Sequence, residues 1–231
     1  MIIVRAKDRN YIDRGWMRGY RSFSFQDYYD EDQDCFCSLL VLNDEEFAPA
    51  RGFNIHPTSD IEVITYVEKG ELEVFNDQLS GRVSLKEGEM QILSYGEATL
   101  HSEINNLPDG RTSFLQFWFT PSKFGAEPFH CIVSPSEEEI RNRLFLAFSQ
   151  KKAAAGKIGQ DVNFYLSFLE KGKTLEFESL RGRGMLIFIL EGELQVGEEL
   201  LFKRDSLRTT SSGIFPVEAK EDCKFFLIDT K

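Results

Sequence analysis

The residues most able to do chemistry in this sequence are three histidines, two of which have a polar residue at a meaningful spacing. His56 is followed two positions later by Thr58, and His101 is followed two positions later by Glu103. Residues i and i+2 of a strand point to the same face. Two such strands meeting in a barrel would bring the four side chains around one interior point, as in a metal site built from sequence-distant pairs. His130 has no ligating residue two positions away, and we interpret it as structural or surface.

The elements that would position these pairs are short strands. Most of the sequence consists of apolar runs with a two-residue period, separated by Gly, Asp, Asn and Ser. The clearest runs are Cys35–Leu42, Glu62–Val67, Met90–Leu93, Ser113–Phe119, Phe164–Leu169, Met185–Leu190 and Phe225–Ile228. Many short strands with frequent turn signals indicate an all-β sandwich or barrel.

One segment favours a helix instead. Ser136 and Glu139 have the spacing of a capping box, and Ile140, Leu144 and Phe148 follow at four-residue intervals. Because the end of this segment also suits a strand, we predict a short helical turn over residues 136–142 and then a strand. Residues 151–157 (KKAAAGK) are expected to form an exposed connection between two halves.

An internal repeat gives the strongest sign of organisation. The stretch from Tyr66 to Val74 (YVEKGELEV) is echoed from Phe188 to Val196 (FILEGELQV), with Gly70 and Gly192 in the same place. Glycine tolerates the positive φ that a hairpin tip requires. At 231 residues the chain has room for two domains of about 115 residues. We therefore predict domains at 1–133 and 134–231, with N-terminal strand residues packing on either.

Several motifs resemble the pirin family. Residues 52–70 (GFNIHPTSDIEVITYVEKG) are similar to its G-F-x-x-H-P-H and T-Y-V-x-x-G signature, and residues 101–105 (HSEIN) match H-S-E-x-N. Residues 13–16 (DRGW), 23–30 (FSFQDYYD) and 114–118 (FLQFW) are also similar to bacterial members. The resemblance is clear over residues 13–120 and weaker to the end of the chain.

This resemblance implies a bicupin of two jelly-roll β-barrels, with Fe(II) or a similar divalent ion in the N-terminal barrel. The implied ligand positions are His56, Thr58, His101 and Glu103, and the family suggests that Glu103 also accepts a substrate proton. The C-terminal repeat contains no histidine, so we expect that barrel to be metal-free. Some pirins are associated with quercetin 2,3-dioxygenase activity and others with regulatory roles through protein partners.

Thr58 departs from the family pattern, because a neutral hydroxyl is a poor ligand for Fe(II). His56, His101 and Glu103 still form a set of two histidines and one carboxylate, as in many non-haem iron oxygenases. Asp60 and Glu62 share strand parity with His56 and would be able to compensate. The alternative is that the two histidines are hydrogen-bonded remnants of a lost site.

Two functions follow from these readings. The first is a dioxygenase of the quercetin 2,3-dioxygenase type, acting on an enolic small molecule in the N-terminal barrel. The second is a metal-free binding or regulatory protein that acts through a small ligand or a protein partner. Fold alone does not decide between them.

The composition limits the classes of molecule that the protein is expected to bind. The formal net charge of −11 argues against nucleic acid and against an anionic membrane surface. Without a signal peptide or a long apolar stretch, we expect a cytoplasmic protein with reduced cysteines. Cys35 and Cys37 do not have zinc-site spacing, and we interpret them as small side chains on one face of a strand, a redox-sensing thiol being the alternative.

Overall fold

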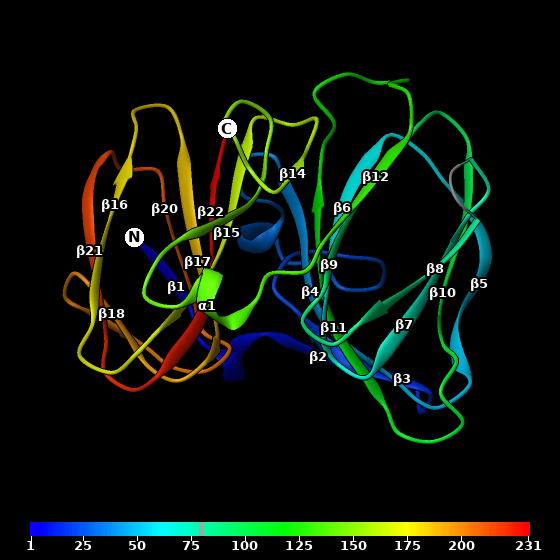
Figure 1. The fold of residues 1–231 in the computed structure, drawn as a ribbon, viewed down its shortest axis with the longest axis horizontal. Helices are drawn as coiled ribbons and strands as arrows, with labels where there is room; N and C mark the ends of the chain where they lie inside the picture. Colours follow the sequence, from blue (N-terminus) through cyan, green and yellow to red (C-terminus); the bar gives the residue numbers. More distant parts are fainter. Residues whose placement is uncertain (79–80) are drawn as a thin grey trace. The chain divides into compact units, whose positions relative to one another are not determined.

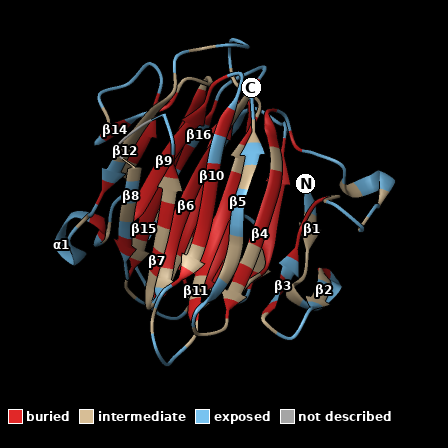
Figure 2. Ribbon diagram, turned by 90° about the vertical axis from the view of Figure 1, so that its right-hand side faces the viewer, coloured by how far each residue is buried: buried red, intermediate tan, exposed pale blue. Residues whose placement is uncertain are grey.

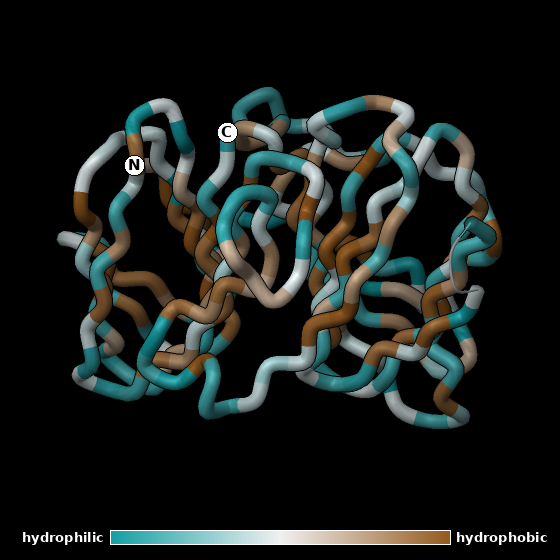
Figure 3. The backbone as a smooth tube through the Cα atoms, turned by 45° about the horizontal axis from the view of Figure 1, so that its top comes forward, coloured by the Kyte–Doolittle hydropathy of each residue, from teal (hydrophilic) through white to brown (hydrophobic). Residues whose placement is uncertain are grey.

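The computed structural model describes residues 1–78 and 81–231, and nearly all of its regular structure is β-strand (Figure 1). This confirms the all-β, two-barrel prediction. Hydrophobic residues follow the strands while hydrophilic residues gather at the turns (Figure 3). Within the described ranges, no helix is long and apolar enough to cross a membrane.

The chain forms two compact units, and each takes a short segment from the other half of the sequence. The N-terminal barrel comprises Asn10–Ser134 and Gly156–Gln160. The C-terminal barrel comprises Met1–Arg9, Pro135–Ala155 and Asp161–Lys231. The first strand of the chain thus belongs to the C-terminal barrel.

The N-terminal barrel is built from antiparallel strands in two sheets. Its strands are β2 (Asn10–Asp13), β3 (Met17–Arg21), β4 (Leu39–Phe47), β5 (Arg51–Thr58), β6 (Ile61–Lys69), β7 (Glu71–Asn76), β8 (Gly81–Lys86), β9 (Met90–Tyr95), β10 (Thr99–Asn105), β11 (Thr112–Phe119), β12 (Phe129–Val133) and the short β14 (Gly156–Lys157). One sheet has the order β12-β9-β6-β11-β4-β3-β2, the other has the order β5-β10-β7-β8, and β14 belongs to neither. Figure 2 shows the smaller sheet, where β5 is far more exposed than β10 beside it.

The C-terminal barrel repeats this plan. Its strands are β1 (Ile2–Val4), β13 (Phe145–Ser149), β15 (Val162–Leu169), β16 (Thr174–Ser179), β17 (Gly184–Glu191), β18 (Leu194–Val196), β19 (Glu199–Leu201), β20 (Ser206–Thr209), β21 (Gly213–Ala219) and β22 (Cys223–Thr230). The larger sheet includes the run β1-β20-β17-β22-β15-β13, and the smaller has the order β16-β21-β18-β19. Each barrel has its own apolar core.

Matching backbone hydrogen bonds support the internal repeat. Gly88 N donates to Val67 O at 2.8 Å, and Arg204 N donates to Ile189 O at the same distance. Val67 and Ile189 occupy the same place in the two repeats. The two halves therefore share one β framework.

The turn glycines have the predicted backbone conformation but a different role. Gly70 and Gly192 have φ of +82° and +81°. The prediction that they form hairpin tips is wrong, because β6 and β7 lie in different sheets, as do β17 and β18. Each glycine instead turns the chain from one sheet to the other, close to a neighbouring backbone segment.

The short helix is confirmed, but the first predicted strand begins late. Helix α1 (Glu137–Ile140) starts with a complete capping box between Ser136 and Glu139, and β13 follows. Strand β4 starts at Leu39, so the placement of Cys35 and Cys37 on one strand face is wrong. Both cysteines are exposed, and Cys37 has a φ of +54° because the chain turns there before entering β4.

Candidate metal site

A cavity of about 330 Å³ in the N-terminal barrel brings together residues from four strands. His56 comes from β5, His101 and Glu103 from β10, Glu45 from β4 and Gln116 from β11. Such a volume suits a small-molecule site. The predicted site residues His56, His101 and Glu103 therefore line one cavity, whereas Thr58 does not.

The two histidines are brought side by side by strand pairing. His56 on β5 lies directly opposite His101 on β10, and their ring centroids are 4.0 Å apart. The Tyr95 ring lies 4.9 Å from that of His101. The pairing of β5 with β10 thus brings the two histidine rings together on one face of the sheet.

Each histidine has a nitrogen suited to a metal ion. His56 Nδ1 lies 2.8 Å from Asn54 O. A carbonyl oxygen only accepts, so Nδ1 carries a proton, and Nε2 is the ring nitrogen that would bind a metal. His101 is 3% exposed, and its Nδ1 is buried without a hydrogen-bond partner. Burial, with help from the nearby His56, lowers the pKa of His101 to about 4, so its ring is neutral at pH 7.

Glu103 is buried against polar groups of β11. It is 5% exposed, and Gln116 Nε2 donates to its Oε1 at 2.5 Å. Trp118 Nε1 donates to Gln116 Oε1 at 3.1 Å, which orients the amide. Burial and the negative charge of Glu45 raise the pKa of Glu103 to about 8, although the Gln116 hydrogen bond opposes this.

The pairing of β5 with β10 is irregular at the site. Phe53 and His56 are three positions apart along β5, while their partners Glu103 and His101 are only two positions apart, so β5 contains a bulge. Near this bulge, a Cβ on Gly52 would lie 2.0 Å from Glu103 O. Glycine is therefore required for β5 to approach the backbone of β10.

The prediction that Asp60 or Glu62 replaces the missing ligand at Thr58 is wrong. Asp60 has a φ of +50° in the turn after β5, and its Oδ1 accepts a hydrogen bond from Gly125 N at 2.7 Å. Glu62 lies on β6 and accepts hydrogen bonds from Gly159 N and Gln160 N at 2.8 and 2.7 Å. The turn at Asp60 ends the strand, so parity with His56 does not extend beyond it.

The three remaining residues suit a divalent ion but do not form a finished cluster. In residues 1–78 and 81–231, no three His, Cys, Asp or Glu side chains are gathered closely enough to hold a metal. The histidines are in contact, while Glu103 lies in the same cavity with its carboxylate held by Gln116. The unpartnered nitrogen of His101 and the buried carboxylate are nevertheless the groups that a cation would satisfy.

Glu45 is a site residue that the sequence did not reveal. It is 4% exposed on β4, and Asn43 Nδ2 donates to its Oε1 at 3.3 Å. Burial raises its pKa to about 7, while the charge of Arg21 opposes this rise. The only sequence signal is the inward parity of Asn43 and Glu45, which continue an apolar run.

The C-terminal barrel fills the equivalent positions with apolar side chains. Glu103 pairs with Val74, and Val217 pairs with Val196, its partner in the repeat. Val217 therefore corresponds to Glu103.

The histidine positions follow from the same register. Phe215 and Phe177 face each other across β21 and β16 as His101 and His56 do across β10 and β5. Phe177 lies in the apolar core of that barrel and Phe215 packs against it. Neither side chain offers a donor atom to a metal. His130 is half-buried on β12 opposite Leu93 and does not line the cavity.

Comparison with known proteins gives the family of the chain. Residues 4–119 match the family model described as Pirin, and residues 146–230 match the one described as Quercetinase C-terminal cupin domain. A protein of Caulobacter vibrioides named pirin-like protein is 30% identical over 220 residues, covering 94% of each chain.

Two Escherichia coli comparisons extend this likeness. A protein named quercetin 2,3-dioxygenase is 26% identical over 230 residues, covering 99% of this chain and 98% of that one. The crystal structure of the bacterial pirin YhhW in complex with nickel(II) has a TM-score of 0.94 at 26% identity, covering 99% and 98% of the two chains. Motifs, fold and comparisons agree, and the chain belongs to the pirin family.

Proposed function

We propose that this protein is a metal-dependent dioxygenase of the quercetin 2,3-dioxygenase type, acting on an enolic aromatic molecule in the N-terminal cavity. The observation that carries the proposal is the contact of His56 with His101 in a cavity that also contains the buried Glu103. The relatives named quercetin 2,3-dioxygenase, and the pirin solved with nickel, support a divalent metal and this reaction class.

The walls of the cavity suit a flat, hydroxylated ring system. Phe25, Phe53 and Trp118 line it, and the Phe25 and Trp118 rings meet edge to face at 5.1 Å. Aromatic walls bind an aromatic ligand through burial and ring contacts. The polar groups in the same cavity fix its orientation by hydrogen bonding.

The residues of the cavity would have separate roles in binding the ion and the substrate. His56 and His101 would hold the ion through neutral ring nitrogens, and Glu103 would complete the set with its carboxylate. Gln116 positions Glu103, and Trp118 in turn positions Gln116. Glu103 would also accept the proton of the substrate hydroxyl. The bound ion would supply the redox chemistry with O₂ that these side chains lack.

Thr58 gives weight to a second candidate function. With the fourth ligand position occupied by a hydroxyl, and without a finished cluster in the described residues, the cavity would bind only a small ligand. The protein would then act as a regulatory or binding protein through a partner. This alternative predicts that purified protein contains little metal.

Oxygen uptake tests the proposal. We expect protein reconstituted anaerobically with Fe(II) to consume O₂ when quercetin is added, and His101→Ala to lose at least about 100-fold of this activity, because a ligand is removed. His130→Ala is the matched control, since it removes the histidine outside the cavity, and it should keep wild-type activity.

The contradicting results are equally specific. If the iron-loaded wild type consumes no O₂ with quercetin or other flavonols, the assigned reaction class is wrong. If His101→Ala retains full activity, the assigned site is wrong. Metal content below about a tenth of an equivalent after reconstitution would favour the regulatory alternative.

A further inference from the structure

We propose that Glu45 is a charge partner of the metal site: its carboxylate does not coordinate the ion but holds a divalent cation at His56, His101 and Glu103 by electrostatic attraction. This inference rests on the metal site of the proposed function. It adds a residue from β4, a strand that the family motif does not include.

The geometry places Glu45 on the wall of the same cavity. Its side chain lines the cavity with His56, His101 and Glu103, and it is 4% exposed. Asn43 Nδ2 donates to it at 3.3 Å. A buried carboxylate with one long hydrogen bond from a neutral amide retains most of its attraction for a cation.

The two carboxyl groups of the cavity have unequal access to positive charge. Arg21 is the main positive group that acts on Glu45, with a smaller effect from Arg14, and its guanidinium donates to Phe25 O and Gln26 Oε1 at 3.1 and 3.2 Å. Arg21 offsets one carboxylate, whereas within residues 1–78 and 81–231 the partner of the Glu103 carboxylate is the neutral amide of Gln116. When both carboxyl groups are ionised, as a bound cation would favour, Arg21 offsets only one of them, and His101, whose Nδ1 is unpartnered, lines the same cavity.

The C-terminal barrel indicates that the fold does not need an acid at this place. Glu45 pairs with Phe114, which pairs with Val67. By the repeat, the corresponding chain of pairs runs from Ile189 through Phe225 to Ser167.

A buried serine therefore fills the position in the barrel that has no metal-ligand set. The carboxylate and the ligand set occur together in one barrel and are both missing from the equivalent positions of the other. This joint occurrence is expected if the Glu45 carboxylate stabilises the bound ion.

Nickel(II) titration of the metal-free protein, followed by calorimetry, tests the inference without using activity. We expect Glu45→Gln to weaken nickel binding about 10- to 100-fold at unchanged stoichiometry, as other indirect partners of metal sites do. Glu45→Asp keeps the charge and should keep most of the affinity. Glu46→Gln is the matched control, because Glu46 is the next residue, points away from the cavity and pairs with Arg18.

The thermal midpoint of each metal-free variant separates electrostatics from folding. It shows whether Glu45→Gln still folds, because the amide removes both the repulsion of Glu103 and the attraction of Arg21. If Glu45→Gln does not fold, Glu45→Ser replaces it, since serine occupies the equivalent position of the other barrel.

The outcomes distinguish this inference from the proposed function. Unchanged nickel affinity in Glu45→Gln, with binding lost in His101→Ala, overturns the role of Glu45 and leaves the metal site standing. Equal weakening in Glu45→Asp and Glu45→Gln also overturns it, because charge would not be the cause. A wild type that binds no nickel overturns the metal site itself.

Discussion

At the scale of single residues, the three ligand candidates differ in the hydrogen bonds that they already make. His56 and His101 are in contact, His56 Nδ1 is held by Asn54 O, and the Nδ1 of His101 is buried without a hydrogen-bond partner. Glu103 is turned toward Gln116, which holds its Oε1 at 2.5 Å. An ion bound through the other carboxylate oxygen, Oε2, would leave the Gln116 hydrogen bond in place.

Thr58 is the residue whose replacement most directly tests the missing ligand. It lies two positions after His56 on β5, opposite Thr99 and on the same side of the strand as the histidine. We predict that Thr58→His raises the affinity for nickel(II) by at least about 10-fold, because it adds an imidazole ligand. Equilibrium dialysis at fixed pH measures this change.

Ser59→His is the control for Thr58→His. It introduces the same side chain one residue later, beyond the end of β5 and on an exposed position. Its nickel affinity should equal that of the wild type. Equal gains in both variants would mean that the added histidine binds nickel on the surface and that position 58 does not face the site.

Sequence alone could identify the histidines and Glu103, because strand periodicity fixes which side chains share a face. It could not identify Glu45, since the inward parity of β4 has meaning only when the strand's limits are known. Nor could it show the failure of Asp60, whose positive φ ends the strand. Backbone reversals of this kind depend on tertiary contacts such as the hydrogen bond from Gly125.

At the scale of elements, the approach of β5 to β10 decides the geometry of the site. The bulge in β5 lies between Phe53 and His56, and the regular pairing of β16 with β21 has no counterpart to it. An extra residue increases local twist and changes the direction of the following side chain. The bulge therefore helps to set His56 against His101.

Gly52 makes this approach possible, which gives a prediction for β5. A Cβ at this position would lie 2.0 Å from Glu103 O, so Gly52→Ala must push the two strands apart. We expect a loss of at least about 2 kcal/mol in the free energy of unfolding, as for other overpacked backbone contacts. Urea denaturation of the metal-free protein measures it.

Arg51→Ala, a change at the exposed neighbouring residue, should cost less than about 0.5 kcal/mol. A Gly52→Ala variant as stable as Arg51→Ala would show that β5 does not lie this close to β10. Metal binding should weaken together with stability in Gly52→Ala, because Glu103 is on the displaced backbone.

Most strands could be predicted from alternation, and α1 from its capping box, because both patterns are local. The start of β4 could not, since the run from Cys35 is apolar but turns at Cys37. The bulge in β5 also has no local signal. It is defined only by the register against β10.

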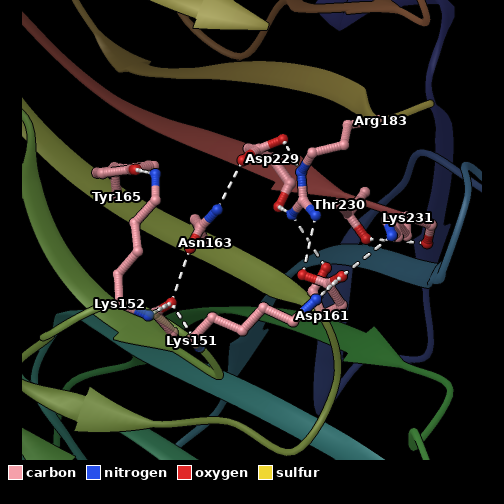
Figure 4. A network of polar contacts seen from close by, with 10 residues as sticks. Lys151, Lys152, Asp161, Asn163, Tyr165, Arg183, Asp229, Thr230 and Lys231 are labelled. Atoms are coloured by element: carbon pink, nitrogen blue, oxygen red, sulfur yellow. Dashed lines mark hydrogen bonds and ion pairs between the residues drawn. The ribbon is translucent and has the colours of Figure 1, made fainter. Parts of the chain in front are cut away.

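At the scale of the whole molecule, the two barrels treat buried carboxylates in opposite ways. In the C-terminal barrel, Arg183 Nε donates to Asp229 Oδ1 at 2.6 Å, and its Nη1 donates to Asp161 Oδ1 at 2.8 Å (Figure 4). Asn163 Nδ2 donates to Asp229 Oδ2 at 2.6 Å. Arginine and amide groups hold these carboxylates. Among residues 1–78 and 81–231, in contrast, no cationic side chain is within hydrogen-bond distance of Glu103 in the N-terminal barrel.

The Arg183 network predicts how stability depends on pH. Burial raises the pKa of Asp161, but hydrogen bonds from Lys151 and Arg183 outweigh this and lower the pKa from 3.8 to about 2. A lowered pKa means that the unfolded chain binds the proton first, so the stabilisation is present above about pH 4 and is lost as the pH falls through 2.

Asp161→Asn tests this dependence. The variant should be less stable than the wild type at pH 7, and the difference should shrink between pH 4 and pH 2. Urea unfolding over this range measures both free energies. A difference that is constant with pH would show that Asp161 does not act through its charge.

The double architecture could be predicted because the two copies share their glycine turns and flanking pattern. The placement of Met1–Arg9 in the C-terminal barrel and of Gly156–Gln160 in the N-terminal barrel could not. Both segments are short, and their positions depend on long-range contacts such as that of Arg5 with Asp205.

The central claim is that one divalent ion binds at His56, His101 and Glu103. A crystal structure of nickel-loaded protein, with anomalous data collected at the nickel edge, tests this claim most directly. We predict one strong anomalous peak per chain, inside the N-terminal cavity and within bonding distance of His56, His101 and Glu103. An anomalous map without a peak in this cavity, or with its strongest peak elsewhere on the chain, would contradict the account.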